Sequence, residues 1–143
     1  MKRFAAAILV LTLVLPVLAQ APAVPELKGK SVELTIWTHE DPARTALEKR
    51  LIAEFSAANP GVKVNYVTYP SSKIKDIVVA GFSANQGPDI FNLEIFDEYQ
   101  FIVNGRVAPV DLKAAGYKNV RDLQAKYLPG MLDPVTEGGK IYG

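Results

Sequence analysis

The feature that most constrains the fold is an alternation of strand-like and helix-like patterns after residue 30. Residues 31–37 (SVELTIW) alternate in polarity, which predicts a β-strand with Val32, Leu34 and Ile36 on one face. Residues 62–69 (VKVNYVTY) predict a second strand. A helical pattern lies between them. Strand, helix and strand in this order form a parallel βαβ unit, so we predict an α/β fold with a mostly parallel sheet flanked by helices.

The intervening helix has clear start and stop signals. Asp41 can accept hydrogen bonds from free N–H groups, and Pro42 suits the first helical position. The segment Asn59-Pro60-Gly61 ends the helix. Apolar residues at intervals of three and four predict the face turned toward the sheet: Leu47, Leu51, Phe55 and Ala58.

The pattern then repeats with less regularity. Ser71 or Ser72 is the expected cap of a helix with Ile74, Ile77, Val78 and Phe82 inward, and residues 89–93 (DIFNL) predict a third strand. Asp97 is the expected cap of a short helix with Tyr99, Ile102 and Val103 inward. Further along, one more apolar face is expected from Val120, Leu123, Tyr127 and Leu128, and residues 137–143 predict a turn that enters a strand.

The first residues have the pattern of a secretory signal peptide. Lys2 and Arg3 precede an apolar run at residues 4–15, which is too short for the ~20 residues of a membrane span. Cleavage is expected after Ala19, which follows the small-x-small rule. We therefore expect a signal peptide at 1–19, a flexible leader at 20–30 and a partial lobe at 31–143. No stable membrane insertion is expected after processing.

Composition removes several classes of function. The 143 residues carry a formal net charge of +1 and lack a long Lys/Arg run, which argues against a nucleic-acid partner. The chain has no cysteine, so a disulfide scaffold and a lipid anchor on a processed N-terminal cysteine are both excluded. An exported protein without such an anchor is expected in the periplasm, and we expect a monomer.

Four stretches, in order, resemble the extracellular solute-binding proteins of ABC transporters, in the sugar-binding group that includes maltose-binding protein. The resemblance lies in their order and spacing behind a signal peptide. The stretches are Leu34 to His39, Phe55 to Val64, Gly87 to Phe91, and Asn104 to Asp111, with Gly139 to Gly143 as a closing segment.

The resemblance implies the N-terminal part of a two-lobed binding protein that holds its ligand in a hinged cleft. It implies a periplasmic substrate-binding component that captures a carbohydrate or related polyol and delivers it to an inner-membrane ABC transporter permease. Such a component needs no cofactor and is not an enzyme. The last residues, Lys140-Ile141-Tyr142-Gly143, read as the middle of an element, so we expect a fragment of a longer chain.

Candidate ligand-binding residues follow the predicted strands, because ligands of open α/β sheets lie beyond the carboxyl ends of the strands. Sugars need polar groups for their hydroxyls and an aromatic plate for a C–H face. The polar candidates are Thr38, His39, Glu40, Asp41, Asn92, Glu94 and Asp97, and the aromatic candidates are Trp37, Tyr69 and Phe96. The resemblance places Asp41 at a ligand-contacting aspartate and Leu93 at an aromatic platform, a departure that suggests a different or smaller sugar.

Other roles remain open for these residues. Asp41 and Asp97 also suit helix capping, Trp37 suits the core, and Glu94 suits a solvated helix entry. His39 is the single histidine and lacks a spacing motif for a metal, so no metal site is predicted. The alternative function is a secreted carbohydrate-active hydrolase with paired carboxylates from Glu40, Asp41, Glu94 or Asp97.

Overall fold

The computed structural model describes residues 29–143, so the predicted signal peptide and all but the end of the predicted leader lie outside the described residues. Three parallel strands form the main sheet in the order β2-β1-β3: β1 (Val32–His39), β2 (Val62–Tyr69) and β3 (Ile90–Phe91). Trp37 is the Cα partner of both Val67 and Phe91. The predicted α/β class with a parallel sheet is confirmed. The first strand runs further than predicted, to His39, whereas β3 is limited to two residues.

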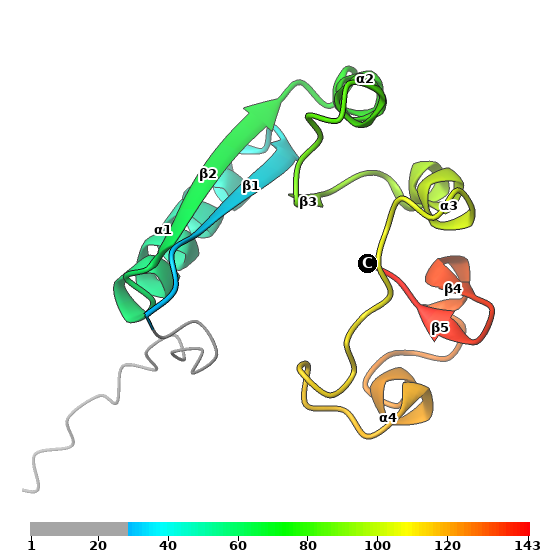
Figure 1. Ribbon diagram of the computed structural model, residues 1–143. Helices are drawn as coiled ribbons and strands as arrows, with labels where there is room; N and C mark the ends of the chain where they lie inside the picture. The colour runs from blue at the N-terminus through cyan, green and yellow to red at the C-terminus, as the bar shows by residue number, and fades with distance from the viewer. Residues whose placement is uncertain (1–28) are drawn as a thin grey trace, which may run out of the picture.

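Helix α1 (Pro42–Ala58) connects β1 to β2 and lies along one face of these two strands (Figure 1). Asp41 is its N-cap, as predicted. The predicted inward face is wrong in part, because Leu47 and Leu51 are 46% and 48% exposed. Phe55 and Ala58 are half-buried as predicted, and Ile52 is half-buried in place of the two leucines. The helix is turned so that Glu48 faces β2 and accepts from the hydroxyl of Tyr66.

Helix α2 (Ile74–Ser83) joins β2 to β3 and supplies two of the three buried residues of the core cluster. Ile74 and Val78 are buried with Phe101, and the rings of Trp37 and Tyr69 pack against this cluster. The predicted cap at Ser71 or Ser72 is wrong, because the main-chain carbonyl of Pro70 accepts from the N–H groups of residues 73 and 74.

Helix α3 (Ile95–Val103) follows β3, and its N-cap is Glu94 rather than the predicted Asp97. The carbonyl of Glu94 accepts from the N–H of Asp97, which places Asp97 in the first turn. There its negative charge suits the positive end of the helix dipole. The buried residues of α3 are Phe101 and Ile102, whereas the predicted inward residues Tyr99 and Val103 are about half exposed. The reason is that Phe101 packs between the rings of Phe82 and Phe91.

The last part of the described chain folds beside α3. Helix α4 (Val120–Gln124) is short and buries Leu123, and because it ends there, the predicted inward residues Tyr127 and Leu128 are exposed. A 3-10 turn, η2 (Asp133–Val135), leads into an antiparallel pair, β4 (Thr136–Glu137) and β5 (Lys140–Ile141). The predicted turn and strand at 137–143 are confirmed, and Tyr142 bridges to Pro109.

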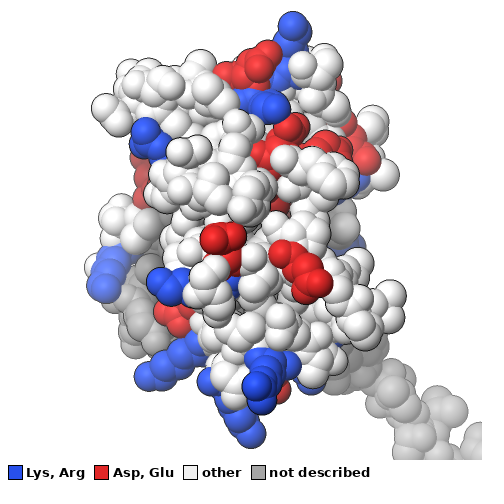
Figure 2. Space-filling model, turned by 90° about the vertical axis from the view of Figure 1, so that its right-hand side faces the viewer, with Lys and Arg blue, Asp and Glu red and all other residues white. Residues whose placement is uncertain are grey.

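Two surface properties follow from this arrangement. Among residues 29–143, no helix is long and apolar enough to cross a membrane. The face shown in Figure 2 mixes positive and negative side chains among uncharged ones, in keeping with the small net charge of the whole sequence.

Candidate functional site

The carboxyl ends of the three parallel strands meet at one edge of the sheet, where His39 and Asn92 contact each other. Asn92 Oδ1 accepts from the main-chain N–H of His39 at 3.0 Å. The Nδ2 atom of the same amide lies 3.0 Å from His39 Nδ1. The next residue, Glu40, is exposed, and its N–H donates to the carbonyl of Tyr69 on β2. Two predicted site residues from separate loops are therefore joined directly.

Arg44, in the first turn of α1, holds this edge from the other side. Its Nη2 donates to the carbonyl of His39 at 2.7 Å. Its Nε is buried and lies 3.4 Å from Glu48 Oε1, within ion-pair range but without hydrogen-bond alignment. Glu48 in turn accepts from Tyr66, whose hydroxyl lies 3.0 Å from Thr38 Oγ1. This network ties helix α1 to the end of β1.

The network also decides the surroundings of Thr38. Its side chain is buried and bonded to Tyr66, so it faces α1 rather than the loop that His39 begins. Arg44, Glu48 and Tyr66 were not among the predicted site residues. The sequence could have indicated Arg44, because it lies three residues after the capping Asp41. Nothing in the local pattern indicates the contact of Glu48 with Tyr66, which lies on another element.

Asp41 is exposed and caps α1 by accepting from the N–H of Arg44 at 2.9 Å. This hydrogen bond is the main reason that the pKa of Asp41 lies below its ordinary value, and the nearby charges of Arg44 and His39 act in the same direction. The carboxylate therefore stays ionised and open to solvent, with lone pairs left for another donor.

The loop after β3 holds the remaining polar candidates. Asn92 is half-buried through its contact with His39, and Glu94 is exposed at the start of α3. Asp97 is half-buried and forms an ion pair with Lys75 of α2 at 2.6 Å. Asp97 therefore already has a cationic partner, whereas Glu94 faces solvent.

The three predicted aromatic candidates have different surroundings. Trp37 and Tyr69 meet edge to face with their centroids 5.4 Å apart and pack against the core cluster. Trp37 therefore has the core position that its strand pattern also allowed. Phe96 is 91% exposed in the first turn of α3, the most exposed of the large apolar side chains among the described residues. An exposed ring beside polar loops has the properties of a stacking surface.

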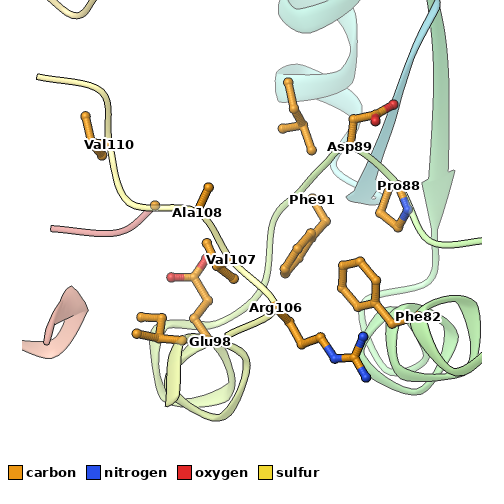
Figure 3. A pocket seen from close by; sticks show the side chains of 12 residues that line it. Phe82, Pro88, Asp89, Phe91, Glu98, Arg106, Val107, Ala108 and Val110 are labelled. Atoms are coloured by element: carbon orange, nitrogen blue, oxygen red, sulfur yellow. The ribbon is translucent and has the colours of Figure 1, made fainter. Parts of the chain in front are cut away.

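A separate hollow of about 310 Å³ lies beside β3 (Figure 3), and His39 is not among the residues that line it. The rings of Phe82 and Phe91 form one wall, and Glu98 points toward the segment with Val107 and Ala108. Burial raises the pKa of Glu98, while a hydrogen bond from the N–H of Leu93 opposes this shift. Most residues that line this hollow are apolar, and three charged residues, Asp89, Glu98 and Arg106, line it as well.

Metal ligation has no support in the part of the chain that the structure describes. Among residues 29–143, no group of three or more His, Cys, Asp or Glu side chains could hold a metal ion.

Comparison with known proteins gives a family and a fold. A family model described as bacterial extracellular solute-binding protein matches residues 40–142. No curated protein matches the sequence.

Solved structures are similar over most of the described chain. One comes from work on xylan utilisation by the thermophilic bacterium Caldanaerobius polysaccharolyticus, with 30% identity and a TM-score of 0.58. The sugar-binding protein MalE from Xanthomonas citri shows 25% identity and a TM-score of 0.63. An ABC transporter solute-binding protein from Agrobacterium vitis S4, solved with D-mannitol, shows 26% identity and a TM-score of 0.64.

Each of these three alignments covers 78% of this chain but only 26 to 28% of the other chain. The 143 residues thus span little more than a quarter of the length of these relatives.

Proposed function

The chain belongs to the bacterial extracellular solute-binding proteins, and from that premise we propose that it contributes part of a binding site for a carbohydrate or related polyol. The observation that carries the proposal is the contact of His39 with Asn92 at the carboxyl edge of the sheet, with exposed Asp41 two residues further along the chain. These groups donate and accept hydrogen bonds, as hydroxyl-rich ligands require. The relatives support the same ligand class: one was solved with D-mannitol, one is a sugar-binding protein, and one comes from work on xylan utilisation.

The proposed physiological role is that of a substrate-binding component for an ABC importer. We propose delivery to an inner-membrane permease, which is supported by the family and by the similarity to an ABC transporter solute-binding protein. The proposed location is the periplasm, with export directed by the signal peptide that the sequence predicts at 1–19. We propose that the protein acts as a monomer.

We propose binding without catalysis rather than the alternative, a carbohydrate-active hydrolase. A hydrolase of that kind needs two carboxyl groups that face one sugar across the scissile bond. Here Asp41 caps α1, and Asp97 is paired with Lys75. The family is a solute-binding class, which supports binding without chemistry.

Nuclear magnetic resonance (NMR) titration tests the proposal, because a site built from little more than a quarter of the relatives' length should bind weakly. D-mannitol and xylotriose at millimolar concentration should shift amide resonances of residues 38–41 and 92–97. The spectrum of the sugar itself should stay unchanged during incubation, since cleaved xylotriose would support the hydrolase instead. Absence of shifts with both probes would overturn the proposed ligand class.

Phe96→Ala sharpens this test. The ring is 91% exposed, so its loss should leave the melting temperature unchanged while weakening binding of xylotriose several-fold. Leu128→Ala is the matched control, because Leu128 is also strongly exposed but lies beyond α4. Equal affinities of the Phe96 and Leu128 variants would remove Phe96 from the site.

A further inference from the structure

The two contacts between Asn92 and His39 determine the orientation of the Asn92 amide. The main-chain N–H of His39 is a donor only, so the Asn92 atom 3.0 Å from it must be the acceptor Oδ1. The amide NH₂ then faces His39 Nδ1, also at 3.0 Å. Reversing the amide would place the NH₂ group against the main-chain N–H, donor against donor. The main-chain N–H of His39 therefore determines that Asn92 accepts through Oδ1 and donates through Nδ2.

This orientation also determines the proton position on the imidazole. An NH₂ group donates, so His39 Nδ1 must accept through its lone pair. A neutral imidazole carries one proton, which therefore lies on Nε2. Among residues 29–143, no hydrogen-bond partner of Nε2 is recorded, and Arg44 already takes the His39 carbonyl. Backbone N–H, backbone carbonyl and Nδ1 are all occupied, and Nε2–H is left as a donor.

We propose that Asn92 is a positioning residue that fixes His39 as its Nε2–H tautomer, so that His39 presents a hydrogen-bond donor to a ligand hydroxyl. The identity of the ligand rests on the proposed function, whereas the tautomer rests only on the contacts between Asn92 and His39. The donor complements exposed Asp41, which can only accept while it is ionised. A polyol carries hydroxyls that both donate and accept, so its hydroxyls suit both kinds of group.

The tautomer can be measured without any ligand, because His39 is the only histidine in the sequence. Long-range ¹H–¹⁵N correlation of untagged protein at pH 8.5, above the usual range of imidazole titration, reports which ring nitrogen carries the proton. We expect a single pattern with a protonated Nε2 and an unprotonated Nδ1. A protonated Nδ1, or the averaged pattern of two exchanging tautomers, would overturn the proposal.

Asn92→Asp tests the positioning role directly. A carboxylate keeps the acceptor for the His39 N–H but cannot donate to Nδ1, so the ring proton should move to Nδ1. The matched control is Asn104→Asp at the end of α3, which makes the same chemical change where the amide donates to the main-chain carbonyl of Gln100. Its His39 pattern should equal that of the wild type. An unchanged pattern in Asn92→Asp would show that Asn92 does not set the tautomer.

Measurements of D-mannitol binding then test the second part of the proposal, the role of His39 as a donor to the ligand, separately from the tautomer. Asn92→Asp should weaken binding at least several-fold, and His39→Gln should retain more affinity than His39→Asn, because the longer amide carries an NH₂ near the position of Nε2. Equal losses in both His39 variants would contradict a donor role for Nε2. If the wild type keeps the Nε2–H tautomer but binds neither D-mannitol nor xylotriose, the proposed function fails while the tautomer assignment stands.

Discussion

At the scale of single residues, Arg44 links the helix start to the loop edge. Its N–H donates to Asp41 and its guanidinium donates to the His39 carbonyl, so one residue fixes both the cap of α1 and the end of β1. The guanidinium is also beside Glu48, which neutralises it where it is partly buried. Arg44 therefore holds the Asp41 carboxylate through its main-chain N–H and the main-chain carbonyl of His39 through its side chain.

Asp41 gives a prediction with a defined pH dependence. Its pKa is lowered in the folded state, so the folded chain binds fewer protons than the unfolded chain near that pKa. The stabilisation by the ionised cap is complete above the unfolded pKa of aspartate and is lost as pH falls through the folded value. At pH 7 the melting temperature should fall in the order wild type, Asp41→Asn, Asp41→Ala, because asparagine still caps but carries no charge.

Thermal unfolding as a function of pH checks this order. The gap between wild type and Asp41→Asn should close at strongly acidic pH, where the wild-type carboxyl is protonated, while Asp41→Ala should remain the least stable. A gap that persists at low pH would show that charge on Asp41 contributes nothing. D-mannitol binding that survives in Asp41→Asn and Asp41→Ala alike would leave Asp41 as a cap only.

At the scale of secondary structure, β2 and α1 were predictable because their signals are local. The bounds of β2 follow from its alternating residues, and Asp41-Pro42 gives the start of α1. The rotation of α1 was not predictable, because Leu47, Leu51, Ile52 and Phe55 allow two overlapping apolar faces. The bond from Tyr66 to Glu48 decides between them, and it joins residues 18 positions apart.

The candidate site shows the same division. The edge itself was predictable, since ligands lie beyond the carboxyl ends of parallel strands. The partners within it were not. The contact of His39 with Asn92 spans 53 positions, and the cap of α3 depends on the extended backbone of Glu94 rather than on the side chain of Asp97.

Gly81 gives a prediction about the packing of α2 on the sheet. A Cβ there would lie 2.9 Å from two atoms of the Trp37 ring and 3.2 Å from Gly87 Cα. Gly81→Ala should therefore displace the ring, at an overpacking cost of about 1–3 kcal/mol. Better helix propensity of alanine offsets about 1 kcal/mol of this cost. We expect a lower melting temperature and altered fluorescence of Trp37, the single tryptophan.

Ala80→Gly is the control for Gly81→Ala, because it changes helix propensity at an exposed neighbouring position. It should destabilise α2 by about 1 kcal/mol without changing the Trp37 emission of the folded state. If Gly81→Ala instead raised the melting temperature and left the emission unchanged, α2 would not approach Trp37 as closely as the structure shows.

At the scale of the whole molecule, the core is unevenly distributed. Ile74, Val78 and Phe101 form the buried cluster between α2, α3 and the sheet, whereas α1 has no fully buried residue. Ile90 of β3 is half exposed as well, since α1 covers only β1 and β2. The three relatives are about four times as long as the matched region, because the alignments cover only 26 to 28% of their chains. The exposed apolar residues of α1 and β3 are therefore described for only a part of the length of such a protein.

This distribution predicts unequal effects of core and α1 substitutions on the free energy of unfolding. Val78 is fully buried, so Val78→Ala should cost about 2 kcal/mol through lost burial and a residual cavity. Leu51 is 48% exposed and already in a helix, so Leu51→Ala should cost less than about 1 kcal/mol. Urea unfolding of both variants measures the difference. An equal cost for Leu51→Ala and Val78→Ala would contradict the prediction, because it would mean that Leu51 is more buried than the structure shows.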